Sequence, residues 1–250
     1  MVFGIAGCRE APTMVLLGRP LVLQPYAAGA SCSLQLGLVS CDTVLAVPGS
    51  MDTPAERRVV PGVFPALKLI VDLTGSTACV VRADRTLRCW GVNSWGALGR
   101  GRAPTPGEAV LEISGPEAPH DLPPVVDVAA GQLFFCALDA VGGIWCWGRN
   151  EFGQVAAMSP ATVPTPVAVD GIPPAVEVVA SVDQACARTE HGEVWCWGDA
   201  DVGTPHTPRR VVEGASHLRL ERDHICATTG DGESCWDAAP TLHSLSGSGE

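Results

Sequence analysis

The chain has 250 residues, of which 46% are hydrophobic and 17% are charged, and its formal net charge is -11. This composition allows a substantial buried core and excludes a chain that is disordered throughout. The acidic balance, without any run of Lys or Arg, argues against binding to nucleic acid or to an anionic membrane surface. No apolar run reaches the ~20 residues that a membrane-spanning helix needs, so no membrane span is predicted.

Near the N-terminus, Cys8 follows Ile5-Ala6-Gly7, a triplet that resembles the lipobox of bacterial lipoproteins. Only seven residues precede Cys8 and none is basic, whereas a secretory signal needs a basic start and an apolar stretch of roughly 7–15 residues. Two hypotheses stay open. Either the precursor begins further upstream and Cys8 carries a lipid anchor, or the triplet is a coincidence and Cys8 is a free thiol. Residues 1–11 are therefore treated as a separate segment.

The rest of the chain is dominated by an internal repeat that paired cysteines mark. A weak copy lies at 27–42, plain copies follow at 73–91, 130–148 and 180–198, and a shortened copy lies at 220–236. Successive first cysteines are separated by 47, 57, 50 and 40 residues, about the length of a four-stranded propeller blade. We place the repeats at approximately 12–50, 51–106, 107–166, 167–208 and 209–238, followed by a flexible tail at 239–250.

Each copy has the same order of predicted strands. In the third copy, the apolar strand Val125–Val128 comes first, a cysteine strand and a polar turn follow, and a Cys-Trp strand leads to the closing strand Pro166–Val169. Alternation and β-branched residues predict strands, and no stretch has a capped helical period. The predicted fold is therefore an all-β β-propeller of about five visible four-stranded repeats, either incomplete or with further blades too diverged to recognise.

The two cysteines of each copy are nine or ten residues apart, which places them opposite each other across a hairpin. In the third copy, a turn around Gly142 sets Cys136 against Cys146. Opposed residues in a non-hydrogen-bonded pair approach closely enough for a disulfide, which needs a Cβ separation of roughly 3.5–4.5 Å. In the shortened copy, a two-residue turn at Gly230-Asp231 keeps the cysteines opposed.

Five disulfides are therefore predicted, with buried free thiols as the alternative. The predicted pairs are Cys32–Cys41, Cys79–Cys89, Cys136–Cys146, Cys186–Cys196 and Cys226–Cys235. A structural zinc site is disfavoured, because it needs cysteines roughly two to four residues apart and the sequence has no such pair.

Tryptophans recur at fixed places in the copies. Trp145 and Trp147 share one face of their strand while Cys146 takes the other, and the fourth copy repeats this arrangement. The indoles form either an aromatic binding surface or the packing between neighbouring blades, and their recurrence favours packing. The residues predicted to pack the repeat are Trp90, Trp145, Trp147, Trp195, Trp197, Trp236, Gly91, Gly148 and Gly198.

The segments Cys136–Gln154 and Cys89–Gly99 resemble the repeat of the regulator of chromosome condensation family, whose pattern runs Cys-Ala-Leu, a Gly turn, then Trp-Gly-x-Asn-x-x-Gly-Gln-Leu-Gly. The match is partial at Trp197–Gly203 and eroded in the first and last copies. The resemblance implies a β-propeller in which the glycines supply turns or close backbone approach. The cysteine-paired form looks like the variant common in exported bacterial proteins. Typical members have about seven repeats and five are visible here, which leaves ring closure open.

The sequence has no recognised catalytic motif, so an enzyme, a cofactor and a metal site are not expected. The histidines His191, His206, His217 and His224 lack the spacing of metal ligands. Four scattered acids are expected to be solvated loop carboxylates: Asp121, Asp127, Glu177 and Asp183.

The predicted function is a non-enzymatic scaffold that binds a protein partner of unknown identity, with the Pro- and Gly-rich insertion Arg100–Pro124 as the contact loop. Guanine-nucleotide exchange on a small GTPase, inhibition of an enzyme, and, least favoured, catalysis by a propeller enzyme are the alternatives. Paired cysteines predict an extracytoplasmic location, whether periplasmic, secreted or as an outer-membrane lipoprotein. A cytoplasmic location is the alternative if the cysteines are reduced.

Overall fold

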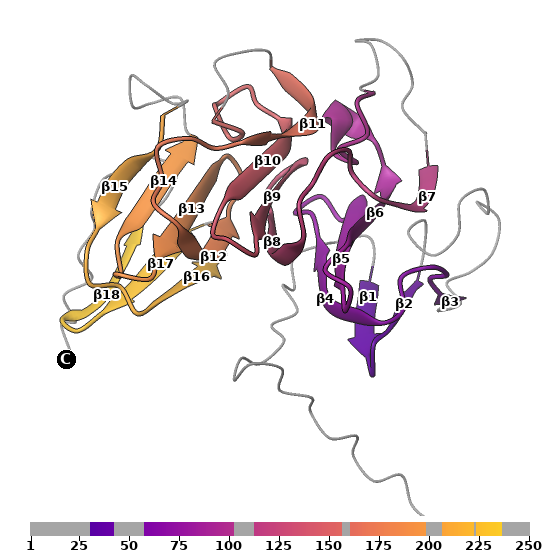
Figure 1. Ribbon diagram of the computed structural model, residues 1–250, viewed down its shortest axis with the longest axis horizontal. Helices are drawn as coiled ribbons and strands as arrows, with labels where there is room; N and C mark the ends of the chain where they lie inside the picture. Colours follow the sequence, from indigo (N-terminus) through magenta and orange to yellow (C-terminus); the bar gives the residue numbers. More distant parts are fainter. Residues whose placement is uncertain are drawn as a thin grey trace, which may run out of the picture.

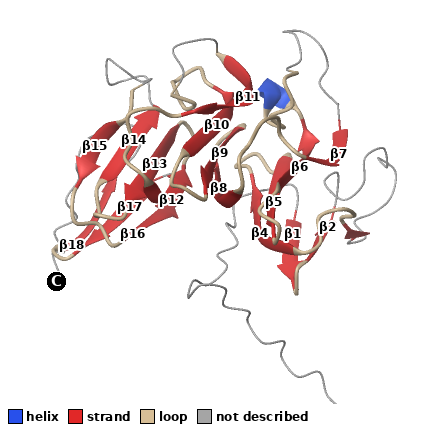
Figure 2. Cartoon of the chain, in the orientation of Figure 1, coloured by secondary structure: helices blue, strands red, loops and turns tan. Residues whose placement is uncertain are grey.

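The computed structural model describes residues 31–42, 58–102, 113–156, 161–198, 207–222 and 224–236. Within these ranges, the regular structure is β-strand apart from one short 3-10 helix, η1 (Ser94–Gly96). The strands form five antiparallel sheets that follow one another along the chain and fan out side by side (Figures 1 and 2). The predicted all-β class and propeller arrangement are therefore confirmed.

The three central sheets have four strands each, and the first and last have three within the described residues. The first sheet contains β1 (Ser31–Gln35), β2 (Leu38–Asp42) and β3 (Arg58–Val59). The second contains β4 (Ala66–Val71), β5 (Thr77–Arg82), β6 (Leu87–Val92) and β7 (Ile113–Glu117). The third contains β8 (Val125–Ala130), β9 (Phe134–Asp139), β10 (Ile144–Arg149) and β11 (Thr162–Ala168).

The fourth sheet contains β12 (Ala175–Ala180), β13 (Gln184–Thr189), β14 (Val194–Gly198) and β15 (Arg209–Val212). The fifth contains β16 (His217–Glu221), β17 (His224–Thr229) and β18 (Gly232–Trp236). Strands within each sheet are paired in chain order. Neighbouring sheets meet through their first strands, β4 with β8, β8 with β12 and β12 with β16, so these strands lie innermost in the array.

A bulge recurs at one place in the central sheets. The register between the first and second strands shifts between Ala66 and Lys68, and again at the equivalent positions of β8 and β12. A bulge leaves one residue unpaired and increases the local twist of the strand. The same deformation in three successive sheets gives each inner strand the same bend.

The hydrophobic core consists of repeated layers between sheets. Trp147 and Phe135 of the third sheet stack with ring centroids 5.9 Å apart and pack against Val81 and Leu98 of the second. Trp197 of the fourth sheet joins Phe134 of the third in the next layer. Because each layer is made by two sheets, a single sheet has no complete core of its own, as is usual for repeat proteins.

The repeat boundaries expected from the sequence differ from the sheets. The strands β3, β7 and β15 each pair with the strand before them and close the first, second and fourth sheets, although the expected boundaries placed them in the following repeat. Cysteines and tryptophans mark only the middle strands, so the closing strands had no marker. The segments 1–11 and 239–250, including Cys8, lie outside the described residues.

Candidate functional site

The structure joins the five predicted cysteine pairs as disulfides with Cα atoms 4.0–4.1 Å apart. Each bridge links two directly opposed residues of a hairpin, such as Cys136 and Cys146. In the three central sheets both cysteines are buried, whereas Cys32 and Cys235 of the outer sheets are half-buried. The hairpins that carry the repeat are therefore closed covalently at their centres.

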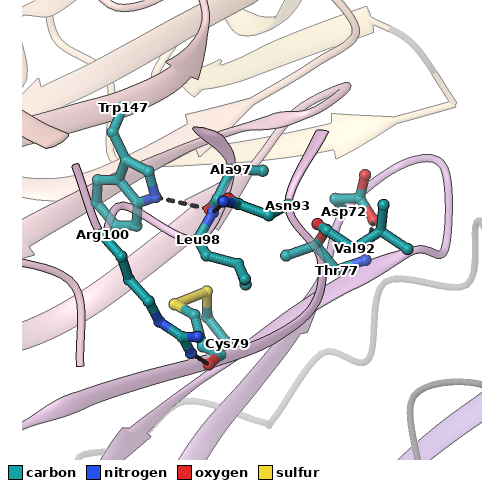
Figure 3. Close-up of a disulfide and its surroundings, with 10 residues drawn as sticks. Asp72, Thr77, Cys79, Val92, Asn93, Ala97, Leu98, Arg100 and Trp147 are labelled. Atoms are coloured by element: carbon teal, nitrogen blue, oxygen red, sulfur yellow. Dashed lines mark hydrogen bonds between the residues drawn. A yellow bond between two sulfur atoms is a disulfide. The ribbon is translucent and has the colours of Figure 1, made fainter. Parts of the chain in front are cut away.

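A tryptophan hydrogen bond links the second and third sheets. The Asn93 side chain accepts the Leu98 N–H at 3.1 Å and so fixes the loop that follows β6. The carbonyl of Ala97 in this loop then accepts the Trp147 indole N–H at 2.8 Å (Figure 3). A loop of one sheet thus supplies the acceptor for a buried side chain of the next.

The third and fourth sheets repeat this link. Asn150 accepts the Val155 N–H at 3.0 Å, and the Gln154 carbonyl accepts the Trp197 indole N–H at 2.9 Å. The sequence reasoning identified both tryptophans but assigned no role to the asparagines. Their signal was present, because each stands three residues after the preceding tryptophan, Trp90 or Trp147.

The other residues predicted to pack the repeat lie as follows. Trp90 and Trp236 are buried in the layers that join the first to the second and the fourth to the fifth sheet. Trp145 and Trp195 are half-buried, and their indole N–H groups donate to acids of their own hairpins, Asp139 at 2.9 Å and Glu193 at 3.4 Å.

The predicted glycines all have positive φ: Gly91, Gly148 and Gly198. A Cβ at Gly148 would lie 2.4 Å from the Leu133 carbonyl oxygen, so any other residue would collide with the neighbouring strand.

Charged residues occupy the third position of every inner strand in the last four sheets: Lys68, Asp127, Glu177 and Arg219. Lys68 forms an ion pair with Asp127 between the second and third sheets. Glu177, only 3% exposed, accepts from Arg188 Nε at 2.8 Å and from the Leu218 N–H at 3.2 Å, and His217 Nδ1 lies 2.7 Å away. Asp127 and Glu177 are therefore strand residues in ion pairs, which corrects the expectation of solvated loop carboxylates.

One edge of the array, the loop face, consists of the turns between first and second strands and the loops between third and fourth strands. In the described part of this face, Arg149 forms two ion pairs: its Nε lies 2.7 Å from Glu151 and its Nη1 lies 3.1 Å from Asp183. The guanidinium also lies 5.0 Å from the centre of the Phe152 ring. The charge of Arg149 is thus neutralised locally, which also places Asp183 in an ion pair rather than free in solvent.

The turn between β4 and β5 on the loop face is held by Asp72. Its carboxylate accepts the backbone N–H of Thr77 at 2.8 Å (Figure 3). It also accepts the backbone N–H of Ser76 at 2.8 Å. Burial raises the pKa of the Asp72 carboxyl above its ordinary value, while these hydrogen bonds oppose the shift. Asp72 has a full set of structural partners, so its role is to shape the turn.

The opposite edge, the hairpin face, consists of the hairpin tips between second and third strands and the connections between sheets. Each tip carbonyl accepts a backbone N–H at or just before the start of the next sheet's inner strand: Gly37 from Ala66, Arg85 from Val125, Gly142 from Ala175 and Gly192 from Ala215, at 2.8–2.9 Å. Large exposed apolar side chains of the described residues gather on or beside this face: Leu36, Leu38, Val59, Phe64, Val126, Val141 and Val176. Exposed apolar groups therefore gather on the hairpin face, which also carries ion pairs such as that of Arg82 with Asp84.

Metal-ligating side chains approach one another at one place in the described residues, where ligand atoms of Glu221, Cys226, Glu233 and Cys235 lie within 4.8 Å. The two sulfurs form a disulfide, and Arg219 bonds both carboxylates at 2.6–2.7 Å. This group therefore does not fit a metal ion. Of the histidines, His191 is exposed, His217 pairs with Glu177, and His206 lies outside the described residues. Among the helices of the described residues, none is long and apolar enough to cross a membrane.

Comparison with known protein families identifies the repeat. Two models of the regulator of chromosome condensation (RCC1) repeat match residues 125–154 and 141–188. The chain contains RCC1 repeats. The second match runs from the tip of the third sheet to β13 of the fourth, so the RCC1 sequence repeat straddles two sheets and includes the loop with Asn150.

Curated and solved relatives agree with the RCC1 fold. The human (Homo sapiens) and mouse (Mus musculus) E3 ubiquitin-protein ligase HERC2 are each 29% identical over 132 residues, 52% of this chain but 2% of theirs. Human WBSCR16 has a TM-score of 0.68 at 18% identity, over 85% of this chain and 60% of that one. Prp20p of Saccharomyces cerevisiae has a TM-score of 0.63 at 21% identity, over 87% and 54%. The chain thus spans less than two thirds of each of these proteins.

Proposed function

We propose that the chain is a non-enzymatic scaffold whose RCC1-type sheets present a rigid surface to a protein partner. This proposal rests on four equivalent backbone hydrogen bonds, each of which ties one hairpin tip to the next sheet. Together with a disulfide at the centre of every hairpin, they hold the tips in fixed positions. A preorganised surface loses less conformational entropy when it binds, so this rigidity favours binding.

Related structures support a protein partner. Among the similar structures, yeast RCC1 (Prp20) is bound to Kap60, and Prp20p is described with its binding to Gsp1p and histones. No described residue favours nucleotide exchange over simple binding in this chain, so exchange and enzyme inhibition stay alternatives. The insertion Arg100–Pro124 stays a proposed contact, although its residues 113–117 form β7 and its residues 103–112 lie outside the described ranges.

We also propose that each of the five sheets is one propeller blade. We further propose that the protein works outside the cytoplasm. Five disulfides support the location, because such bonds persist in oxidising compartments. Intact mass of the protein from its native host, with alkylation before and after reduction, tests this. The ten paired cysteines should react only after reduction, and their reaction without reduction would move the protein to the cytoplasm.

Quantitative affinity purification from the native host, after mild crosslinking, tests the scaffold. A stoichiometric protein partner should be retained by the wild type and lost after reduction and alkylation, which releases the hairpins. A second variant in which residues 103–112 are replaced by a Gly-Ser linker tests the insertion. If the wild type recovered no crosslinked protein, the scaffold proposal would fail. Accelerated nucleotide release from a host GTPase would instead favour exchange.

A further inference from the structure

The hairpin face of the third and fourth sheets carries three exposed valines around one tip. Val126, Val141 and Val176 are 43%, 82% and 41% exposed. The Ala140 N–H donates to the Pro124 carbonyl at 3.0 Å, and the Ala175 N–H donates to the Gly142 carbonyl at 2.9 Å. These bonds join the tip to the starts of β8 and β12, so the three side chains border one surface.

The repeat does not require these valines to be exposed. The tip position of Val141 is occupied by Asp84 in the second sheet and by His191 in the fourth, on the same backbone bond. Val126 and Val176 each follow the residue that bonds to a hairpin tip, and the corresponding residue in the fifth sheet, after Ala215, is the polar Ser216. Apolar exposure is therefore a property of this part of the face and not of the fold.

Uncompensated acids surround the valines. Asp121, Asp170 and Glu190 are exposed on the adjoining connections and tip, and their side chains form no ion pair or hydrogen bond within the described ranges. Exposed bases also lie on this face: Arg85 on the tip of the second sheet, and Arg210, which is paired with Glu193 and Glu213 beside the tip of the fourth. On the loop face, by contrast, Arg149 is neutralised by two acids. The electrostatic complement of the valine surface is thus basic.

We propose that this surface, the hairpin patch of Val126, Val141 and Val176 with its acids Asp121, Asp170 and Glu190, docks a protein segment that carries apolar anchors flanked by Lys or Arg. The proposal rests on the scaffold function and names its binding surface and partner chemistry. Apolar contact at the centre supplies affinity, because it removes exposed side chains from water. The acids steer a basic segment and disfavour an acidic one.

The test uses the full chain and a labelled 12-residue peptide of alternating Leu and Lys, with fluorescence anisotropy as the readout. Two matched peptides replace every Lys by Glu or every Leu by Ser. We expect the Leu-Lys peptide to bind about tenfold more tightly than either control. The double variant V141S/V176S and the single variant D170K should each weaken binding about fivefold, without a change in melting temperature, because these side chains are exposed.

The control is Glu221→Lys, which makes the same charge change on an exposed residue of the fifth sheet, away from the patch, and its melting temperature is compared with the wild type because it also breaks the ion pair with Arg219. It should leave binding within about twofold of the wild type. If E221K and D170K weakened peptide binding equally, the effect would be a non-specific attraction to an acidic chain, and the patch proposal would be overturned. Unchanged binding in V141S/V176S would overturn it as well.

The host purification separates the two proposals. If a native partner is captured equally by wild type and V141S/V176S, the scaffold stands and the patch fails. If no partner is captured at all, the scaffold proposal fails, even if the peptide binds.

Discussion

The junction between the third and fourth sheets and the junction between the fourth and fifth use the same tryptophan position in different ways. Trp197 donates its indole N–H to the Gln154 carbonyl at 2.9 Å. Trp236, at the equivalent position of the fifth sheet, is only 4% exposed, yet its indole N–H has no hydrogen-bond partner within the described residues. A buried N–H without an acceptor costs about 1–3 kcal/mol. The tryptophan alone therefore does not make the junction.

The sequences that precede the two tryptophans differ. Asn93 and Asn150 stand three residues after a tryptophan and hold the loop that offers the carbonyl, but Ala200 stands three residues after Trp197. The fourth and fifth sheets are instead linked by Glu177 of β12, which accepts from the Leu218 backbone and contacts His217 of β16. One junction depends on an indole and the other on a buried carboxylate.

Removal of that carboxylate charge should have the largest effect. In Glu177→Gln the side chain of Arg188, 11% exposed, loses its ion-pair partner. We expect the free energy of unfolding to fall by about 3 kcal/mol, because one charge of a buried pair is left uncompensated. Urea unfolding followed by tryptophan fluorescence measures this. Glu213→Gln removes an acid that is 69% exposed and should change stability by less than about 0.5 kcal/mol. Similar losses in both variants would refute the importance of the buried pair.

The two tryptophans provide the next comparison. Trp197→Phe leaves the buried Gln154 carbonyl without its donor, whereas Trp236→Phe removes an N–H that has no acceptor among the described residues. We expect Trp197→Phe to cost about 2 kcal/mol more than Trp236→Phe, since the two share the same loss of ring volume. Thermal unfolding of both proteins gives the difference directly. Equal costs would show that the indole hydrogen bond does not distinguish the junctions.

The hairpin tip of the third sheet should respond to pH. Burial raises the pKa of Asp139, but hydrogen bonds from the Trp145 indole and from the Gly143 and Val141 N–H groups outweigh it and hold the pKa below its ordinary value. A carboxyl with a lowered folded pKa adds stability above the unfolded value of about 3.9, and this is lost as pH falls through the folded pKa.

Asp139→Asn should therefore cost about 1 kcal/mol at pH 7, and the gap between variant and wild type should close as the pH is lowered from 5 to 2. Denaturant unfolding at each pH provides the measurement. A gap that stayed constant across this range would mean that the charge of Asp139 contributes nothing.

The smallest expected effect comes from restoring the repeat pattern before the fifth sheet. Ala200→Asn places the missing asparagine three residues after Trp197. If it recreates an acceptor for Trp236, we expect a gain of about 0.5–1 kcal/mol in unfolding free energy, the net value of one hydrogen bond. The same substitution in a Trp236→Phe background serves as the control and should give no gain. A gain in both backgrounds would point to a local loop effect instead.

Residues that recur with fixed spacing made much of the fold predictable. Cys136 opposite Cys146 follows from a symmetric hairpin, and it implies the pairing of β9 with β10 in each copy. The strands β3, β7 and β15 could not be assigned correctly, because their pairing depends on the loop before them and not on any residue they carry. The ion pairs of Lys68 and Glu177 were equally hidden, since each joins different repeats that only packing brings together.

The functional surface was harder to predict from the sequence for the same reason. The sequence pointed to a long insertion as the contact loop, while the exposed valines of the hairpin patch stand in ordinary strand and turn positions. Val126 and Val176 read as core residues of an alternating strand, and only the bulge turns them toward solvent. A pattern with a period of two does not reveal where that period is interrupted.

The bonds that tie each hairpin tip to the next sheet join main-chain atoms only. The side chain beside each bonded carbonyl is Leu36, Asp84, Val141 or His191, and the same bond forms with all four. The bond itself therefore places no requirement on the side chain at these tip positions. A new partner can be accommodated by replacing tip side chains one at a time, while the strands beneath keep their sequence and the molecule keeps its shape.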